Sequence, residues 1–157
     1  IRRLVVVLAS GLAIAGTAVV FRAGEDVTTD SRFAPVERLE VLPAEDRRAL
    51  AEAGFHAPER LCRALEDEAG LAEWSSRTGI GVDRLREHRE RVALVLHQGL
   101  GDARARELAG LGIRTRTDLA RWSPQRLAAA LRGAGARGPD RFLERRATVW
   151  LDRLSAD

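Results

Sequence analysis

Few residues of this sequence have the types and spacing that catalysis or metal binding requires. Cys62 is the only cysteine, and the three histidines, His56, His88 and His97, do not form a ligand cluster with it. A single thiol excludes an intramolecular disulfide and a zinc site of the usual Cys/His spacing. The acidic run at 66–68 indicates a solvated helix face. We therefore predict no catalytic residue, no metal site and no cofactor, and expect that the protein is not an enzyme.

The segment Gly99-Leu100-Gly101 has a pattern that could bind phosphate. Two glycines let the chain reverse within three residues, Leu100 would fill the space between the flanking helices, and the small Ala105 would let their axes approach closely. Backbone N–H groups of such a hairpin grip phosphate without reading sequence. Arg104 and Arg106 follow and would add positive charge. The predicted binding residues are Gly99, Leu100, Gly101, Arg104 and Arg106.

Asp102 and the charge distribution weigh against a nucleic-acid site at this hairpin. The Asp102 carboxylate is expected at the start of the next helix, where it would cap that helix in the place of a phosphate. Residues 22–103 carry 12 Arg and 17 acidic residues, whereas residues 104–157 carry 12 Arg and 6 acidic residues. The chain is therefore a charge dipole along its sequence, and any polyanion site should lie in its last third.

The first twenty or so residues predict a transmembrane helix. Leu4 to Phe21 contain no charged residue, and an 18-residue helix is ~27 Å long, close to the thickness of a bilayer core. Ala13-Ile14-Ala15 resembles a signal-peptidase site, but the apolar run continues beyond it, which favours an uncleaved single-pass anchor. The arginines on the two sides nearly balance. Arg2 and Arg3 favour an extracytoplasmic location for the rest of the chain.

The remaining residues predict an all-α protein. Alanine, leucine and arginine dominate, and there is no tyrosine. A transmembrane segment at 1–22 and a flexible linker at 23–35 are followed by a domain at 36–155. Proline and glycine positions predict the helices of this domain. These are Ala44–Ala53, Pro58–Ala69 ended by Gly70, Leu71–Arg77, Val82–His97, Thr115–Trp122, Pro124–Arg132 after Ser123 as N-cap, and Pro139–Leu154.

An internal repeat indicates that the domain contains two related units. A shift of 58 residues aligns mainly apolar residues and one glycine pair: Leu42 with Leu100, Leu50 with Leu108, Ala51 with Ala109, Gly54 with Gly112, Phe55 with Ile113, and Leu61 with Leu119. The first unit has Val41-Leu42-Pro43 in place of Gly99-Leu100-Gly101. We interpret it as a degenerate copy of the same hairpin.

The chain resembles the tandem helix-hairpin-helix proteins catalogued as domain of unknown function 4332. The resemblance covers about residues 36 to 154, and it implies a compact domain of two helix-hairpin-helix units with no established chemistry. The matching segments are Leu50-Ala51, Ala53-Gly54-Phe55, Arg77-Thr78-Gly79-Ile80, Gly99-Leu100-Gly101, Leu108 with Gly112-Ile113, Asp118-Leu119-Ala120 and Val149-Trp150-Leu151. The long helix departs from the expected polar pattern at Ala93-Leu94-Val95.

Two functions are consistent with these features. The first is a membrane-anchored interaction or scaffold domain, with membrane lipid as a partner through residues 4–21 and an unidentified protein partner. The alternative is nucleic-acid binding through the Gly99-Leu100-Gly101 hairpin. The near-neutral charge of residues 22–157 and Asp102 favour the first interpretation.

Overall fold

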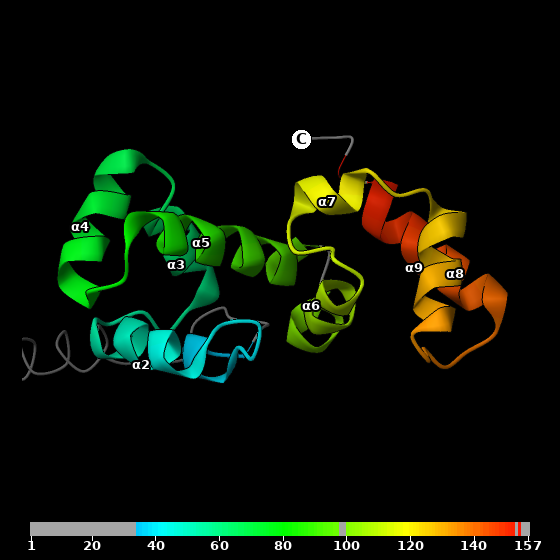
Figure 1. The fold of residues 1–157 in the computed structure, drawn as a ribbon, viewed down its shortest axis with the longest axis horizontal. Coiled ribbons are helices and arrows are strands. Elements are labelled where there is room, and N and C mark those ends of the chain that lie inside the picture. The colour runs from blue at the N-terminus through cyan, green and yellow to red at the C-terminus, as the bar shows by residue number, and fades with distance from the viewer. Residues whose placement is uncertain (1–33, 98–99, 153, 155–157) are drawn as a thin grey trace, which may run out of the picture. The chain divides into compact units, whose positions relative to one another are not determined.

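The computed structural model describes residues 34–97, 100–152 and 154, and these residues form helices joined by short turns (Figure 1). The all-α prediction is therefore confirmed for this part of the chain. None of the helices described is both long and apolar enough to cross a membrane. The predicted span at 4–21, the linker up to residue 33 and Gly99 lie outside the described residues.

The helices follow one another with short connections. In chain order they are η1 (Val36–Arg38), α2 (Ala44–Glu52), α3 (Pro58–Ala64), α4 (Glu68–Thr78), α5 (Val82–Leu96), α6 (Gly101–Gly110), α7 (Arg116–Ala120), α8 (Pro124–Gly133) and α9 (Asp140–Asp152).

Helix α5 organises the packing of its neighbours, since it contacts α3, α4, α6 and α7. Its buried side chains include Leu85, His88, Val92 and Val95, at the spacing that places them on one face. Leu96, the last residue of α5, is only half-buried. The face of α5 toward the core is thus apolar except for one histidine.

The boundary between α3 and α4 differs from the prediction. Helix α3 ends at Ala64, and Gly70 lies inside α4 and does not end a helix. Asp67 is the N-cap of α4, and its Oδ1 accepts a hydrogen bond from the Gly70 N–H at 2.7 Å. The predicted helix over 58–69 was wrong because a short acidic run that indicates a solvated face also contains a capping residue.

Gly70→Ala is expected to lower the free energy of unfolding by about 2 kcal/mol. A Cβ atom at this position would lie 2.1 Å from the backbone oxygen of Ala64, which cannot move without displacing the end of α3. Gly110→Ala is the matched control, because no atom lies within 4 Å of its Cβ. Urea denaturation of both variants measures the difference, and equal stability of the two would contradict the close packing of α3 on α4.

The ends of α2 and α6 repeat the same backbone structure 58 residues apart. Gly54 and Gly112 have φ angles of 95° and 80°, a region that favours glycine. The residue after each glycine donates its N–H to a carbonyl in the preceding helix. These bonds are Phe55 N to Leu50 O at 2.9 Å and Ile113 N to Leu108 O at 3.0 Å.

The turns that precede α2 and α6 also match. Leu42 N donates to Leu39 O at 3.0 Å, and Leu100 N donates to His97 O at 2.8 Å. Leu42 and Leu100 are both buried. The 58-residue repeat therefore corresponds to two segments that share these hydrogen bonds and these buried leucines, although Gly101 and its counterpart Pro43 differ in backbone conformation, with φ angles of 76° and −57°.

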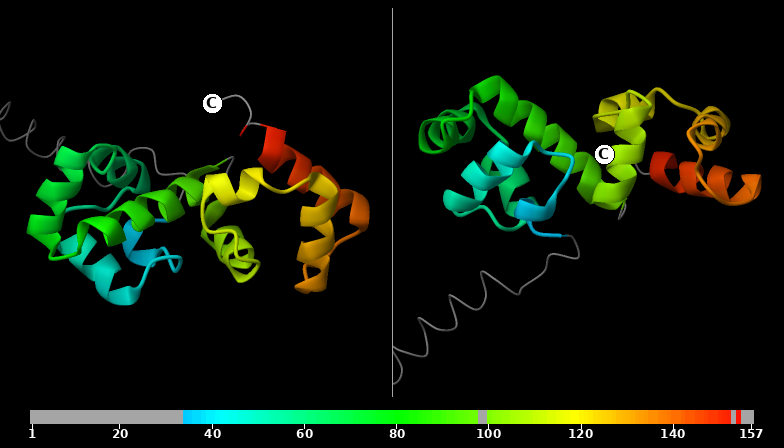
Figure 2. Two further views of the ribbon diagram at one scale, coloured as in Figure 1. Left: turned by 45° about the horizontal axis from the view of Figure 1, so that its top comes forward. Right: turned by 60° about the horizontal axis from the view of Figure 1, so that its bottom comes forward.

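Helices α8 and α9 pack against each other, and Figures 1 and 2 show them side by side at the C-terminal end of the described chain. Leu143, Ala147 and Trp150 of α9 are buried, at the spacing that places them on one face of the helix. The Nε2–H of buried His97 donates to the Trp150 carbonyl at 2.7 Å. This bond ties the end of α5 to α9.

Candidate functional site

Three of the predicted hairpin residues, Leu100, Arg104 and Arg106, have partners within the chain, whereas Gly99 lies outside the described residues. Leu100 is buried and its N–H is bonded to His97 O, while Gly101 begins α6 with a φ of 76°. The Arg104 Nη1 atom lies 2.6 Å from Glu107 Oε1. These contacts do not converge on an open phosphate position.

Asp102 does not cap α6, contrary to the prediction. Its Oδ1 accepts a hydrogen bond from the Val41 N–H at 3.0 Å, across 61 residues of sequence, and α6 has no side-chain cap. Its Oδ2 accepts from Arg106 Nε at 3.1 Å, and Arg106 Nη1 lies 2.6 Å from Glu40 Oε2. Asp102 therefore binds the turn of the first repeat to the first turn of α6.

This bridge shows how the two repeats use their hairpin groups. The Asp102 carboxylate, from the second repeat, accepts the hydrogen bond of the Val41 N–H. A phosphate-binding hairpin would present a free N–H at this place. Arg106 is held by carboxylates from both repeats. The groups that sequence reasoning assigned to phosphate thus contribute to the packing of one repeat on the other.

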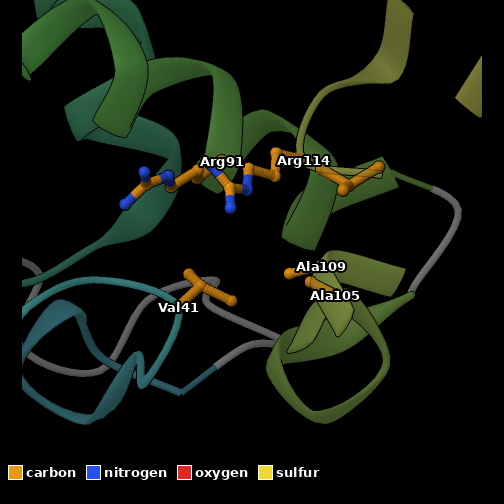
Figure 3. Close-up of a pocket in the computed structure, with 6 residues that line it drawn as sticks. Val41, Arg91, Ala105, Ala109 and Arg114 are labelled. Carbon is orange, nitrogen blue, oxygen red and sulfur yellow. The ribbon is translucent and has the colours of Figure 1, made fainter. Parts of the chain in front are cut away.

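A cavity of about 280 Å³ lies beside this bridge. Its lining, which we call the arginine groove, consists of Val41, Arg91, Leu94, Ala105, Ala109 and Arg114. Figure 3 shows Arg91 and Arg114 along one side of the cavity and Val41, Ala105 and Ala109 on the opposite side. The groove therefore combines an apolar floor with two guanidinium groups.

The two arginines differ in their surroundings. Arg91 Nη2 lies 3.2 Å from Glu87 Oε2, one turn earlier on α5. The exposed Arg114 guanidinium has no carboxylate partner among the described residues. A second cavity of about 470 Å³ is lined by both arginines and also by four carboxylates, those of Asp83, Glu87, Glu90 and Asp118. The positive charge of Arg114 is thus available to an anionic group in the arginine groove, whereas the carboxylates of the second cavity disfavour an anion there.

Hydrogen bonds at the start of α7 fix the backbone position from which the Arg114 side chain extends. Thr115 Oγ1 accepts from Asp118 N, and Asp118 Oδ2 accepts from the backbone N–H groups of Arg114 and Thr115, each at 3.1 Å. The hydrogen bond from the Arg114 N–H is the main reason why the pKa of Asp118 lies below its usual range. This capping box holds the Arg114 backbone beside the groove.

The sequence pattern did not single out Arg91, and it gave no reason to place Arg114 beside it. The two lie on different elements and come together because α5 contacts both α6 and α7. The small residues Ala105 and Ala109 carry the only sequence signal, because one helical turn between them leaves a shallow strip on α6. The sequence prediction used Ala105 to explain helix approach and did not assign it to a groove.

Two other groups of chemical interest are structural. Burial raises the pKa of Cys62 to about 11, so its thiol is protonated at neutral pH. His88 is buried on α5, and its Nε2–H donates to Asp46 Oδ2 at 2.5 Å. Burial lowers the pKa of His88 below its usual range, and its Nδ1 atom has no hydrogen-bond partner. Both groups lie within the core and not in the arginine groove.

Comparison with known protein families identifies a match. A protein-family model described as "Domain of unknown function (DUF4332)" matches residues 41–141, which include both repeats and all residues of the arginine groove. No curated protein and no solved structure matches the chain.

Proposed function

Because the chain belongs to the family described as domain of unknown function DUF4332, which names no activity, we propose its function from the arginine groove. The domain is a non-catalytic protein-interaction module, and its groove binds an acidic segment of a partner protein. The observation that carries this proposal is the pair of guanidinium groups above an apolar cavity, one of them without a carboxylate partner among the described residues.

The size and lining of the groove suit a peptide segment. Its volume of about 280 Å³ lies just below the range of roughly 300–1,000 Å³ that is typical of small-molecule sites. Val41 and Ala109, the half-buried apolar residues of its lining, can contact one apolar side chain, while Arg91 and Arg114 can bind a neighbouring carboxylate with charge-assisted hydrogen bonds. An acidic residue next to a leucine or isoleucine satisfies both halves of the site.

Contacts within the chain already engage the groups of the hairpin that would bind nucleic acid. Arg104 and Arg106 already pair with carboxylates, and the amides of Leu100 and Val41 already donate hydrogen bonds. Binding a phosphate backbone there would require these internal bonds to break. Nucleic-acid binding through Gly99-Leu100-Gly101 is therefore the alternative that the experiment below also tests.

The proposal includes attachment to a membrane through residues 4–21. It rests on the uncharged run from Leu4 to Phe21 and on the flanking Arg2, Arg3 and Arg22. Reporter fusions that are active on one side of the membrane only, placed at the C-terminus, test this attachment and its orientation. Equal activity of both reporters in the soluble cell fraction would overturn it.

Arg91→Gln and Arg114→Gln are each expected to weaken peptide binding about tenfold, and the double variant about a hundredfold. Each substitution removes one charged donor and keeps a polar side chain of similar size. The probe is a fluorescein-labelled peptide of alternating leucine and glutamate, titrated with the full chain and followed by anisotropy. Its glutamine counterpart should bind poorly to the unmodified chain, because it lacks the carboxylates.

Two further variants separate the groove from general charge effects. Arg48→Gln makes the same charge change at an exposed position of α2 and should leave binding unchanged. Ala109→Leu fills the floor of the groove with both arginines intact and should abolish binding. Equal losses for Arg48→Gln and Arg114→Gln would overturn the proposal. Salt-sensitive binding of duplex DNA that Arg104→Ala with Arg106→Ala removes would establish the alternative.

A further inference from the structure

Helix α9 carries an exposed face on which apolar and positively charged side chains alternate. Phe142 and Val149 are the exposed large hydrophobic side chains of the described residues, at 53% and 48% exposure. They lie two turns apart on the side of α9 away from its buried stripe, with Arg145 and Arg146 between them. We call Arg141, Phe142, Arg145, Arg146 and Val149 the outer face of α9.

The outer face has excess positive charge. Among the described residues, Arg145 and Arg146 have no carboxylate partner, and the Arg141 guanidinium lies 5.5 Å from the centre of the Phe142 ring. Of the acidic residues of α9, Asp140 pairs with Arg132 at 2.5 Å. Glu144 lies to one side of this face, and Asp152, three residues after Val149, lies at its C-terminal end. The outer face therefore has three guanidinium groups and one carboxylate near the apolar side chains.

We propose that the outer face of α9 binds the surface of an anionic lipid bilayer. Exposed Phe142 and Val149 can enter the boundary between headgroups and acyl chains, about 10 Å apart along the helix, while the arginines contact anionic headgroups. A folded acidic protein surface would complement the arginines alone. Phe142 and Val149, exposed two turns apart on the same face, require an apolar partner as well, which the interfacial region of an anionic bilayer supplies.

The short length of the segment between the apolar residues and the domain supports a bilayer as the binding partner. Residues 22–33 span at most ~40 Å when fully extended, so an anchor at residues 4–21 keeps the domain close to a bilayer. Such tethering raises the local concentration of lipid, and a weak surface contact becomes populated. This part of the argument rests on the anchor included in the proposed function, whereas the charge and exposure of the outer face do not depend on it.

An environment-sensitive fluorophore on Val149→Cys tests the contact in the full chain. The native Cys62 thiol stays protonated at pH 7 because its pKa is about 11, so labelling favours the introduced cysteine. In vesicles that contain 30% phosphatidylglycerol, the emission should shift to the blue and nitroxide-labelled lipids should quench it. In pure phosphatidylcholine vesicles both effects should be lost.

Matched variants assign the effect to the outer face. Arg145→Gln with Arg146→Gln should reduce the equilibrium constant for the contact about thirtyfold, from ~1 kcal/mol for each arginine near an anionic surface. Phe142→Ser should also reduce it. Arg48→Gln with Arg63→Gln makes the same charge change on exposed positions of α2 and α3 and should have no effect.

Two results would overturn the bilayer contact. One is equal emission in anionic and neutral vesicles. The other is a shift that duplex DNA produces in neutral vesicles and that Arg145→Gln with Arg146→Gln removes, since it would assign the face to nucleic acid. Flotation of the chain with neutral vesicles reports on the anchor separately. If flotation fails, titration of the unanchored chain with anionic vesicles still decides whether the outer face binds lipid.

Discussion

Asp46→Ala is expected to lower the free energy of unfolding by about 3 kcal/mol. Asp46 and His88 are only 4% and 1% exposed, and the Asp46 carboxylate is the sole hydrogen-bond partner of the imidazole among the described residues. Its removal leaves the buried Nε2–H of His88 unsatisfied and also removes the ion pair with Arg84 Nε, at 2.6 Å. Urea denaturation monitored by tryptophan fluorescence measures the loss.

A control substitution on the same helix separates the effect of removing a buried group from a general sensitivity of α2 to substitution. Glu45→Ala, next to Asp46, removes an exposed partner of the same Arg84 and should change stability far less. His88→Leu in the Asp46→Ala background should recover part of the loss, because no buried polar atom of that pair is then unpaired. Equal effects of Asp46→Ala and Glu45→Ala would contradict a closed Asp46–His88 pair.

The same pair gives a pH dependence with a definite sign. Burial lowers the pKa of His88 in the folded chain, so the unfolded chain binds more protons as the pH falls below the ordinary histidine pKa of about 6.5. Stability is therefore expected to be full above pH 7 and to decrease as the pH falls from 7 toward 5. His88→Leu should flatten this slope, and an unchanged slope would assign it to other groups.

Leu108→Ala is expected to cost about 3 kcal/mol of unfolding free energy. Leu108 is fully buried at the end of α6, and its carbonyl also accepts the Ile113 N–H that closes the helix. Its counterpart Leu50→Ala should cost a similar amount, because Leu50 is equally buried and accepts the Phe55 N–H. Both losses are measured by chemical denaturation of the full chain.

Leu111→Ala supplies the control for this pair. Leu111 lies three residues after Leu108 in the same turn but is only half-buried, so its removal should cost about 1 kcal/mol or less. If Leu50→Ala proved nearly neutral while Leu108→Ala was costly, the two repeats would not share one packing scheme. Similar losses would support the equivalence that their backbone hydrogen bonds show.

Local signals explain why most helix boundaries could be predicted. Ser123 accepts the Arg126 N–H at 3.3 Å and starts α8, and Gly112 ends α6 with a positive φ, as their residue types indicate. The α3–α4 boundary failed because Asp67 acts as a cap within an acidic run. A helix cap can thus be predicted where the residue type usually acts as a cap. It cannot be predicted where the same residue type is equally common on a solvated helix face.

The site was harder to predict because it depends on contacts between distant residues. Asp102 was expected to cap its own helix, but it binds the Val41 amide, and nothing local to either residue signals that partner. Arg91 and Arg114 likewise line one cavity only because α5 packs against α6 and α7. The 58-residue repeat was visible in the sequence, whereas the way in which the two repeats pack against each other was not.

The most direct test of the groove is an NMR titration that follows the side-chain Nε–H resonances of arginine. Addition of the leucine–glutamate peptide should shift the resonances of Arg91 and Arg114 and leave those of Arg104 and Arg106 in place, because these two do not line the groove. The glutamine peptide should shift none of them. Shifts at Arg104 and Arg106 with none at Arg91 and Arg114 would contradict the proposed binding site.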